Sequence, residues 1–120
     1  MNKLNSVTIG CLLLLFTFLF NNCNFDVQKK QLPKLYVIEI KQMQFQPALL
    51  KIHAGDTIVW VNHDFVMHDV TEEAHKEWSS SPLAAGASWR IIANKNADYY
   101  CSIHQVMKGK FIIDNEQEIK

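Results

Sequence analysis

Residues 35–61 read LYVIEIKQMQFQPALLKIHAGDTIVWV, and the first part of this stretch alternates with the two-residue period of a β-strand. Leu35 and Val37 fall on one face of such a strand, whereas Ile38 and Ile40 fall on the other. A helix would instead repeat its apolar positions every three or four residues. The stretch therefore predicts a strand at the start of the folded part of the chain.

Two more strands are predicted within the same stretch. Phe45-Gln46-Pro47 interrupts the first run, and residues 49–52 and 57–61 then flank His53-Ala54-Gly55-Asp56, a turn in which glycine accommodates a positive φ. Residues 72–78 leave room for one short helical turn at most. The remaining short strand-like runs are residues 68–71, 88–92, 97–101 and 110–114. The pattern predicts an all-β protein of the β-sandwich class.

Length and composition limit what such a protein does. The chain has 120 residues, which is enough for one small domain, and 48% hydrophobic with 20% charged residues is ordinary for a globular fold. Twelve basic residues balance twelve acidic ones, so no nucleic-acid-binding surface is indicated. The three cysteines are an odd set in very different settings, and they do not predict a disulfide framework.

Residues 101–107, CSIHQVM, place a thiol, an imidazole and a thioether three residues apart in a loop between two predicted strands. A thiolate and an imidazole bind copper in both oxidation states, and a thioether is a weak, soft ligand that suits copper rather than magnesium or calcium. His68 opens a predicted strand after a polar loop, and two such loops can meet at one end of a sandwich. Cys101, His104, Met107 and His68 together predict a copper site.

At these residues the sequence resembles the cupredoxins, small blue-copper β-sandwiches, and especially the plastocyanin, pseudoazurin and amicyanin group. The resemblance runs from about residue 35 to residue 114 and includes FQPALLKIHAGDTIVWVNHD, HDV, the W and S of EWSSSPLAAGASW, and YYCSIHQVMKGKFIID, in the order of the family. Two residues separate Cys101 from His104, and two separate His104 from Met107. This spacing is similar to the amicyanin loop, since plastocyanin-type loops are longer before the methionine.

The resemblance implies a Greek-key sandwich of about seven to eight strands that holds one copper ion in a type 1 site. Carried over to this chain, His68, Cys101 and His104 are the equatorial ligands and Met107 is the long axial ligand. The function implied is not enzymatic: the copper alternates between Cu(I) and Cu(II) and shuttles single electrons between redox partners.

Asp69 stands where the family often has asparagine, a position that braces the ligand loop near the cysteine sulfur. An ionised aspartate accepts hydrogen bonds but cannot donate them through its side chain, and its charge near a thiolate is expected to lower the reduction potential. Ile103 and Gln105 occupy positions where amicyanins commonly carry prolines, so a more mobile loop is expected.

Other kinds of site explain fewer of these residues. A cysteine nucleophile activated by histidine leaves His68 and Met107 without a role. Zinc rarely recruits a thioether. The two-copper centre of terminal oxidases needs a second cysteine in the loop, and residues 101–107 contain one. A copper-delivery or copper-buffering protein with the same four ligands stays open as the alternative function.

The N-terminus predicts export. Lys3 precedes an apolar run, residues 9–20, which has the length of a signal-peptide core and is too short to span a bilayer comfortably. Phe20-Asn21-Asn22-Cys23 resembles a loose bacterial lipobox, with asparagines in place of the usual small residues. The prediction is a signal peptide over 1–22, a lipid anchor at Cys23, a flexible tether over 23–33 and a copper-binding domain over 34–120.

These features predict a monomeric protein of the periplasm or cell envelope that contacts the membrane only through its N-terminal anchor. The expected partners are redox proteins such as a cytochrome, a copper-containing reductase or a dehydrogenase. The sequence does not choose among them.

Overall fold

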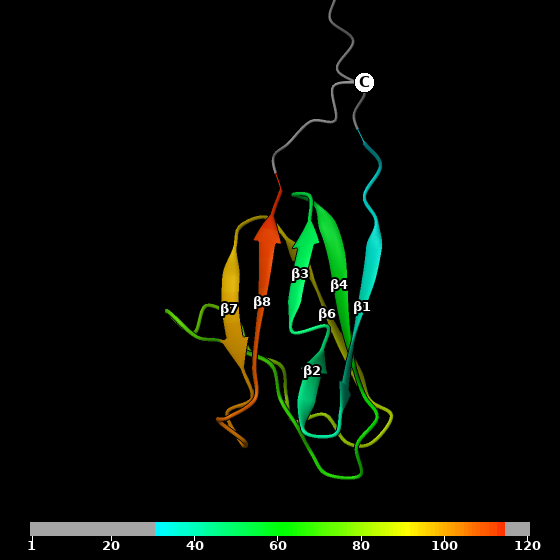
Figure 1. The fold of residues 1–120 in the computed structure, drawn as a ribbon, viewed down its shortest axis with the longest axis vertical. Coiled ribbons are helices and arrows are strands. Elements are labelled where there is room, and N and C mark those ends of the chain that lie inside the picture. The colour runs from blue at the N-terminus through cyan, green and yellow to red at the C-terminus, as the bar shows by residue number, and fades with distance from the viewer. Residues whose placement is uncertain (1–30, 115–120) are drawn as a thin grey trace, which may run out of the picture. The chain divides into compact units, whose positions relative to one another are not determined.

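The computed structural model describes residues 31–114, and these form eight strands in two four-stranded sheets (Figure 1). The strands are β1 (Leu35–Lys41), β2 (Gln44–Gln46), β3 (Leu49–Ile52), β4 (Asp56–Asn62), β5 (Thr71–Glu72), β6 (Ser88–Ala93), β7 (Ala97–Tyr100) and β8 (Lys108–Ile113). No helix occurs among the described residues. The prediction of an all-β sandwich with seven to eight strands is therefore confirmed.

The strand order is β2-β1-β4-β6 in the first sheet and β3-β8-β7-β5 in the second. The chain crosses from one sheet to the other after each strand from β2 to β6, so the two sheets are built together. β1 pairs with β4 in parallel, as β3 does with β8, while the other pairs are antiparallel. Parallel pairs have no hairpin of their own and need these long crossovers.

Burial follows the alternation in the sequence. In β4 the side chains of Ile58 and Trp60 are buried, with half-buried residues between them, and β1 buries Ile38 and Ile40 against them. Between the sheets, Trp60 packs edge-on against Tyr99 of β7 with ring centroids 5.3 Å apart. Burying a large aromatic side chain contributes about 2–3 kcal/mol, so this contact is a main source of stability.

A glycine is required where β8 passes Tyr99. Tyr99 and Gly109 are register partners in the β7–β8 pair, and a Cβ atom on Gly109 would lie 2.3–2.4 Å from three atoms of the Tyr99 side chain. This distance is far shorter than a van der Waals contact. The tyrosine ring therefore occupies the space that any other residue at position 109 would need.

Two local predictions differ from the structure. The three-residue strand β2 falls where the sequence indicates an interruption, and the strand predicted over 68–71 is reduced to β5, with His68 in an isolated bridge to Leu83. The helical turn allowed for residues 72–78 is absent. Its backbone N–H groups at Ala74, His75 and Glu77 donate instead to the carboxylate of Glu72.

Three connections meet at one end of the sandwich, the lower end in Figure 1: the β1–β2 turn, the loop after β4 and the β7–β8 loop. The β7–β8 loop is closed at its base by the pairing of Tyr100 with Lys108. All four predicted ligands lie in the last two of these connections.

The signal peptide, Cys23 and most of the tether lie outside the described residues, and these predictions are untested. Within residues 31–114, no helix is long and apolar enough to cross a membrane.

Candidate metal centre

The β7–β8 loop is short and held by its own backbone. The N–H of Cys101 donates to the carbonyl of Met107 over 3.1 Å, and the N–H of Met107 donates to the carbonyl of His104 over 2.9 Å. These two bonds fold the loop so that Cys101 and Met107 face the interior, where both are buried, while His104 stays partly exposed. The spacing of three residues thus produces a tight turn around one point.

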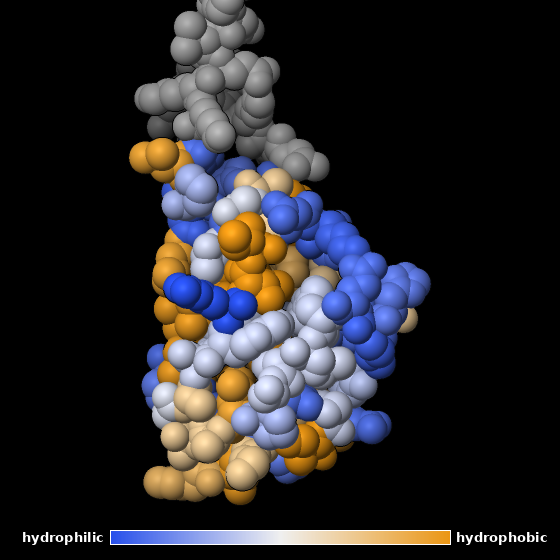
Figure 2. Space-filling model, turned by 180° about the vertical axis from the view of Figure 1, so that it is seen from behind, coloured by the Kyte–Doolittle hydropathy of each residue, from blue (hydrophilic) through white to orange (hydrophobic). Residues whose placement is uncertain are grey.

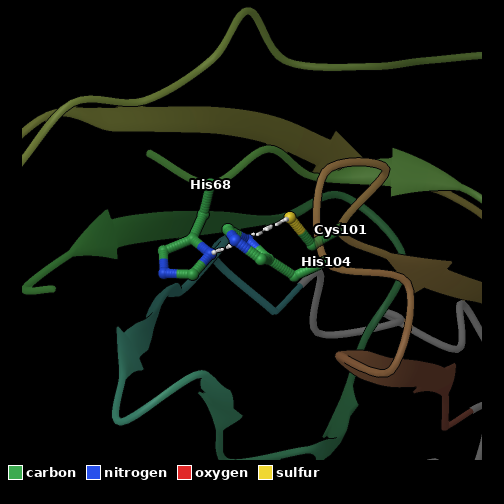
Figure 3. A group of neighbouring side chains, drawn as sticks. All are labelled: His68, Cys101 and His104. Carbon is green, nitrogen blue, oxygen red and sulfur yellow. Dashed lines mark hydrogen bonds between the residues drawn. The ribbon is translucent and has the colours of Figure 1, made fainter. Parts of the chain in front are cut away.

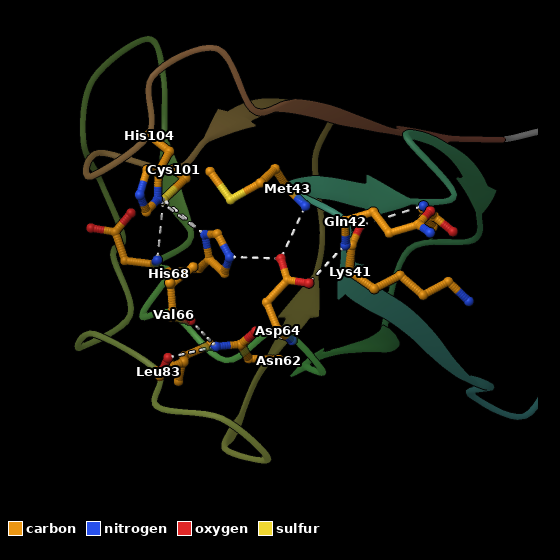
Figure 4. A network of polar contacts seen from close by, with 12 residues as sticks. Lys41, Gln42, Met43, Asn62, Asp64, Val66, His68, Leu83, Cys101 and His104 are labelled. Atoms are coloured by element: carbon orange, nitrogen blue, oxygen red, sulfur yellow. Dashed lines mark hydrogen bonds and ion pairs between the residues drawn. The ribbon is translucent and has the colours of Figure 1, made fainter.

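His68 is fixed from the other side by the loop after β4. Its backbone pairs with Leu83, with N–H to carbonyl distances of 3.3 and 2.7 Å. Asn62, fully buried at the end of β4, donates its side-chain amide to the carbonyls of Val66 and Leu83 over 2.9 and 2.8 Å and accepts from the N–H of Asp64 (Figure 4). The last residue of β4 therefore shapes the loop that delivers His68.

The side chains of His68, Cys101 and His104 point toward one another (Figure 3). Cys101 Sγ lies 3.8 Å from Nδ1 of each histidine, and the two Nδ1 atoms are 3.2 Å apart. His68 and Cys101 are completely buried. Among the described residues, this is the group of histidine, cysteine and acidic side chains that converges closely enough to hold a metal ion.

These distances fit a trigonal metal site. Ligand bonds of about 2.0–2.3 Å to nitrogen and sulfur place three equatorial donors about 3.5–4 Å apart, close to the observed separations. The donor set of one thiol and two imidazoles suits copper or zinc. The histidines must bind as neutral imidazoles and the cysteine as a thiolate.

Met107 is 2% exposed and follows three residues after His104. It lines a pocket of about 170 Å³ together with side chains from the β1–β2 region and its own loop. The other lining residues are Met43, Gln44, Phe45, Ala48, Val106 and Lys108. The structure thus brings three of the four predicted ligands together by their donor atoms and ties the backbone of the fourth, Met107, to Cys101 and His104.

Asp69 contacts the ligand loop in two ways. Its backbone N–H points at Cys101 Sγ over 3.4 Å, and its carboxylate accepts from the backbone N–H and the hydroxyl of Ser102. A hydrogen-bond donor at the sulfur favours the thiolate, the form that binds metal. The predicted bracing role of Asp69 therefore has two contacts that can carry it.

Asp64 is a residue that the sequence reasoning missed. Its carboxylate lies 2.9 Å from Nε2 of His68 and also accepts from the backbone N–H groups of Gln42 and Met43 (Figure 4). Partial burial opposes ionisation of Asp64, but the N–H groups of Met43 and Gln42 and the contact with His68 outweigh it and hold the pKa of the carboxyl below its ordinary value. No spacing in the sequence marks Asp64, because its partners include the distant residues Gln42 and Met43 of the β1–β2 turn.

Comparison with known proteins places this geometry in context. The family model described as "Copper binding proteins, plastocyanin/azurin family" matches residues 34–114. The amicyanin of Paracoccus denitrificans is 25% identical over 84 residues, which are 65% of this chain and 64% of that protein. Amicyanin-alpha of Methylorubrum extorquens is 26% identical over 83 residues, 64% of this chain and 70% of that protein. The matched region thus spans a little under two thirds of the length of the Paracoccus relative.

Solved structures share the fold. A copper-containing nitrite reductase from Thermus scotoductus matches with a TM-score of 0.62 and 25% identity over 73% of this chain and 24% of that one. A copper(I) amicyanin variant matches with a TM-score of 0.61 and 22% identity over 67% of this chain and 82% of that one. A purple cupredoxin from Nitrosopumilus maritimus matches with a TM-score of 0.61 and 23% identity, over 66% and 99% of the two chains.

Proposed function

This chain belongs to the plastocyanin/azurin family of copper-binding proteins, and we propose that it carries single electrons with one copper ion held by His68, Cys101, His104 and Met107. The family match confirms copper as the predicted cofactor. The observation that carries the ligand assignment is the convergence of Cys101 Sγ with Nδ1 of both histidines at separations of 3.2–3.8 Å.

Bound copper would supply a reversible one-electron change between Cu(II) and Cu(I). The residues around it are arranged to change little during that step. His68 is held through its backbone by Leu83, Cys101 through its backbone by Met107, and both side chains are completely buried. A site whose donors are fixed by the fold needs little rearrangement when an electron arrives or leaves.

The same burial argues against an enzyme. A catalytic metal site keeps a coordination position open to water or substrate. Here His68, Cys101 and Met107 are all nearly or completely enclosed, and His104 is the ligand with partial access to solvent. The arrangement supports transfer of an electron through the edge of His104 rather than chemistry on a bound substrate.

The loops that carry the candidate ligands expose several large apolar side chains. They belong to the loop after β4 and the β7–β8 loop, and the lower end of Figure 2 shows orange and tan residues among paler polar ones. They are Phe65, Val66, Met67, Ile103 and Val106, and we call them the apolar rim. Phe65 is 100% and Val106 87% exposed, which is unusual for such large apolar residues. A small surface of this kind suits brief docking with a redox partner.

We infer that the partner is a cytochrome, a copper-containing reductase or a dehydrogenase in the periplasm or cell envelope. The N-terminal run over 1–22, the lipobox-like Cys23 and the polar segment over 23–33 support export and anchoring of a monomeric domain over 34–120.

The experiment uses residues 31–120, because all eight strands and the core lie within 31–114. With one equivalent of copper(II), this fragment should become intensely coloured through cysteine-to-copper charge transfer, and Cys101→Ser should abolish the colour. A colourless one-to-one copper complex would contradict the ligand set. An electron carrier should give a fast, reversible response in voltammetry. A delivery protein should instead release copper readily to a chelator.

A further inference from the structure

Three hydrogen-bond donors converge on the carboxylate of Asp64 in the loop after β4 (Figure 4). The N–H of Gln42 reaches Oδ1 over 2.7 Å and the N–H of Met43 reaches Oδ2 over 3.0 Å. Oδ2 also lies 2.9 Å from Nε2 of His68. The Asp64 side chain is 17% exposed and that of His68 is fully buried, so little water competes for these contacts. One carboxylate thus joins a metal-ligand candidate to the β1–β2 turn.

The contact determines which nitrogen of His68 is available to a metal. An ionised carboxylate is only an acceptor, so Nε2 must carry the proton in this contact. A neutral imidazole with its proton on Nε2 has its lone pair on Nδ1. Nδ1 is the atom of His68 that faces Cys101 and His104.

The β1–β2 turn has a backbone shape that needs support. Gln42 and Met43 have φ values of +54° and +59°, a left-handed conformation that residues with side chains seldom adopt. Both of their N–H groups donate to Asp64, and these two hydrogen bonds stabilise the turn conformation. From the turn, the Met43 side chain extends toward the ligand group in Figure 4, and it lines the same pocket as Met107.

We propose that Asp64 is a positioning residue for the metal ligand His68. It selects the tautomer of His68 that binds metal through Nδ1, and it places a negative charge next to Nε2. It also couples the orientation of the His68 ring to the β1–β2 turn. The proposal deepens the proposed function and rests on it for the identity of the metal. No partner or ligand other than copper is required.

Asp64→Asn tests the proposal, because the amide keeps the shape of the side chain but loses its charge. Its NH₂ group must replace either Oδ1, which accepts from Gln42, or Oδ2, which accepts from Met43 and faces Nε2 of His68. In the copper-free protein, this substitution should change His68 from a pure Nε2-protonated form to a mixture of tautomers, which ¹⁵N NMR measures. Copper(II) affinity should fall about 10- to 100-fold. The reduction potential should rise, because the carboxylate of the wild type stabilises Cu(II) more than Cu(I), and the variant lacks this charge.

Asp56 provides the matched control at the opposite end of β4. Its buried carboxylate also accepts two backbone N–H groups, those of Lys34 and His53, over 2.7 and 2.8 Å. Asp56→Asn should therefore reduce thermal stability as Asp64→Asn does, but leave the His68 tautomer, copper affinity and potential as in the wild type. Equal effects of the two substitutions on these three quantities would reduce Asp64 to a structural role and overturn the proposal.

Wild-type protein gives a second measurement if Asp64→Asn does not fold. The copper-free wild type should show His68 protonated at Nε2, and protonation at Nδ1 would overturn the proposal without any variant. This outcome is independent of the proposed function, which fails on a different result, a colourless copper complex of the wild type.

Discussion

Asp69 binds Ser102 through both of its carboxylate oxygens, one accepting from the backbone N–H and the other from the hydroxyl of Ser102. Because Ser102 directly follows Cys101, this pair joins the strand region after His68 to the β7–β8 loop. The carboxylate is 33 residues away from Ser102 in sequence and is almost fully buried. A negative charge is therefore held beside the metal centre by a rigid contact.

Asp69→Asn should raise the reduction potential. The amide oxygen can still accept from the N–H of Ser102 and its NH₂ group can donate to the hydroxyl, so the main change is the lost charge. We expect the Cu(II)/Cu(I) equilibrium to change about tenfold, which corresponds to about 59 mV for one electron. Voltammetry measures it, with Ser102→Ala as the control that keeps the charge. An unchanged potential in Asp69→Asn contradicts the prediction.

Met107→Leu should keep the colour of the copper(II) protein and raise its potential. Leucine has a similar volume, so the core is preserved, and the colour depends on Cys101 rather than on the thioether. Cu(II) loses a donor and becomes less favourable, by about tenfold in the redox equilibrium. Met67→Leu is the control, since Met67 is exposed on the apolar rim. If both variants have the wild-type potential, Met107 is not a ligand.

Val106→Glu should slow electron self-exchange between two copies of the copper protein by about tenfold or more, because like charges then meet across the apolar rim. NMR line broadening in a mixture of Cu(I) and Cu(II) protein measures the rate. Ile92→Glu is the control, because Ile92 is also largely exposed, at 65% against 87% for Val106, but pairs with Thr57 near the far end of the sandwich. Equal slowing by both variants would show that the rim is not the docking surface.

Gly109→Ala should destabilise the fold by at least about 1–3 kcal/mol, because the new Cβ overlaps the Tyr99 ring. Urea unfolding of the copper-free protein measures the change. Lys110→Ala serves as the neighbouring control, since Lys110 is exposed and its ion pair with Asp98 is at the surface. A fully stable Gly109→Ala variant would mean that Tyr99 moves aside freely.

Alkaline pH should destabilise the protein through Tyr99. Burial raises the pKa of Tyr99 from 10 to about 12. The unfolded chain therefore loses this proton first, and the stabilisation that is complete below pH 10 is lost as the pH rises toward 12. The difference corresponds to roughly 2–3 kcal/mol. Tyr99→Phe should flatten this part of the urea-unfolding profile, and an unchanged profile would exclude Tyr99 as its source.

The sequence predicted what depends on local pattern. Alternation in residues 35–40 gave β1, and the three-residue spacing of Cys101, His104 and Met107 gave a ligand loop. His68 was found because it opens a short segment after a polar loop in a sequence that resembles a known family. These features need no knowledge of long-range contacts.

The rest depends on contacts between distant residues. The role of Asp64 arises from a turn 22 residues earlier, and that turn has neither the glycine nor the asparagine that usually marks positive φ. Because the sequence does not mark this turn, it also gave no signal for β2, the strand that follows the turn. The sequence allowed at most one helical turn over 72–78, and the structure has none there because the Glu72 carboxylate takes up the N–H groups that a helix would use.

β1 starts at the end of the sandwich opposite the metal centre and finishes at the turn that contacts Asp64 (Figure 1). Its seven residues span about 20 Å, and β8 returns over a similar length. A tag, fusion partner or surface linker joined before Lys34 would therefore be attached at the end of the sandwich opposite the metal centre. Molecules immobilised on an electrode through this end would share one orientation, with the edge of His104 facing away from the electrode.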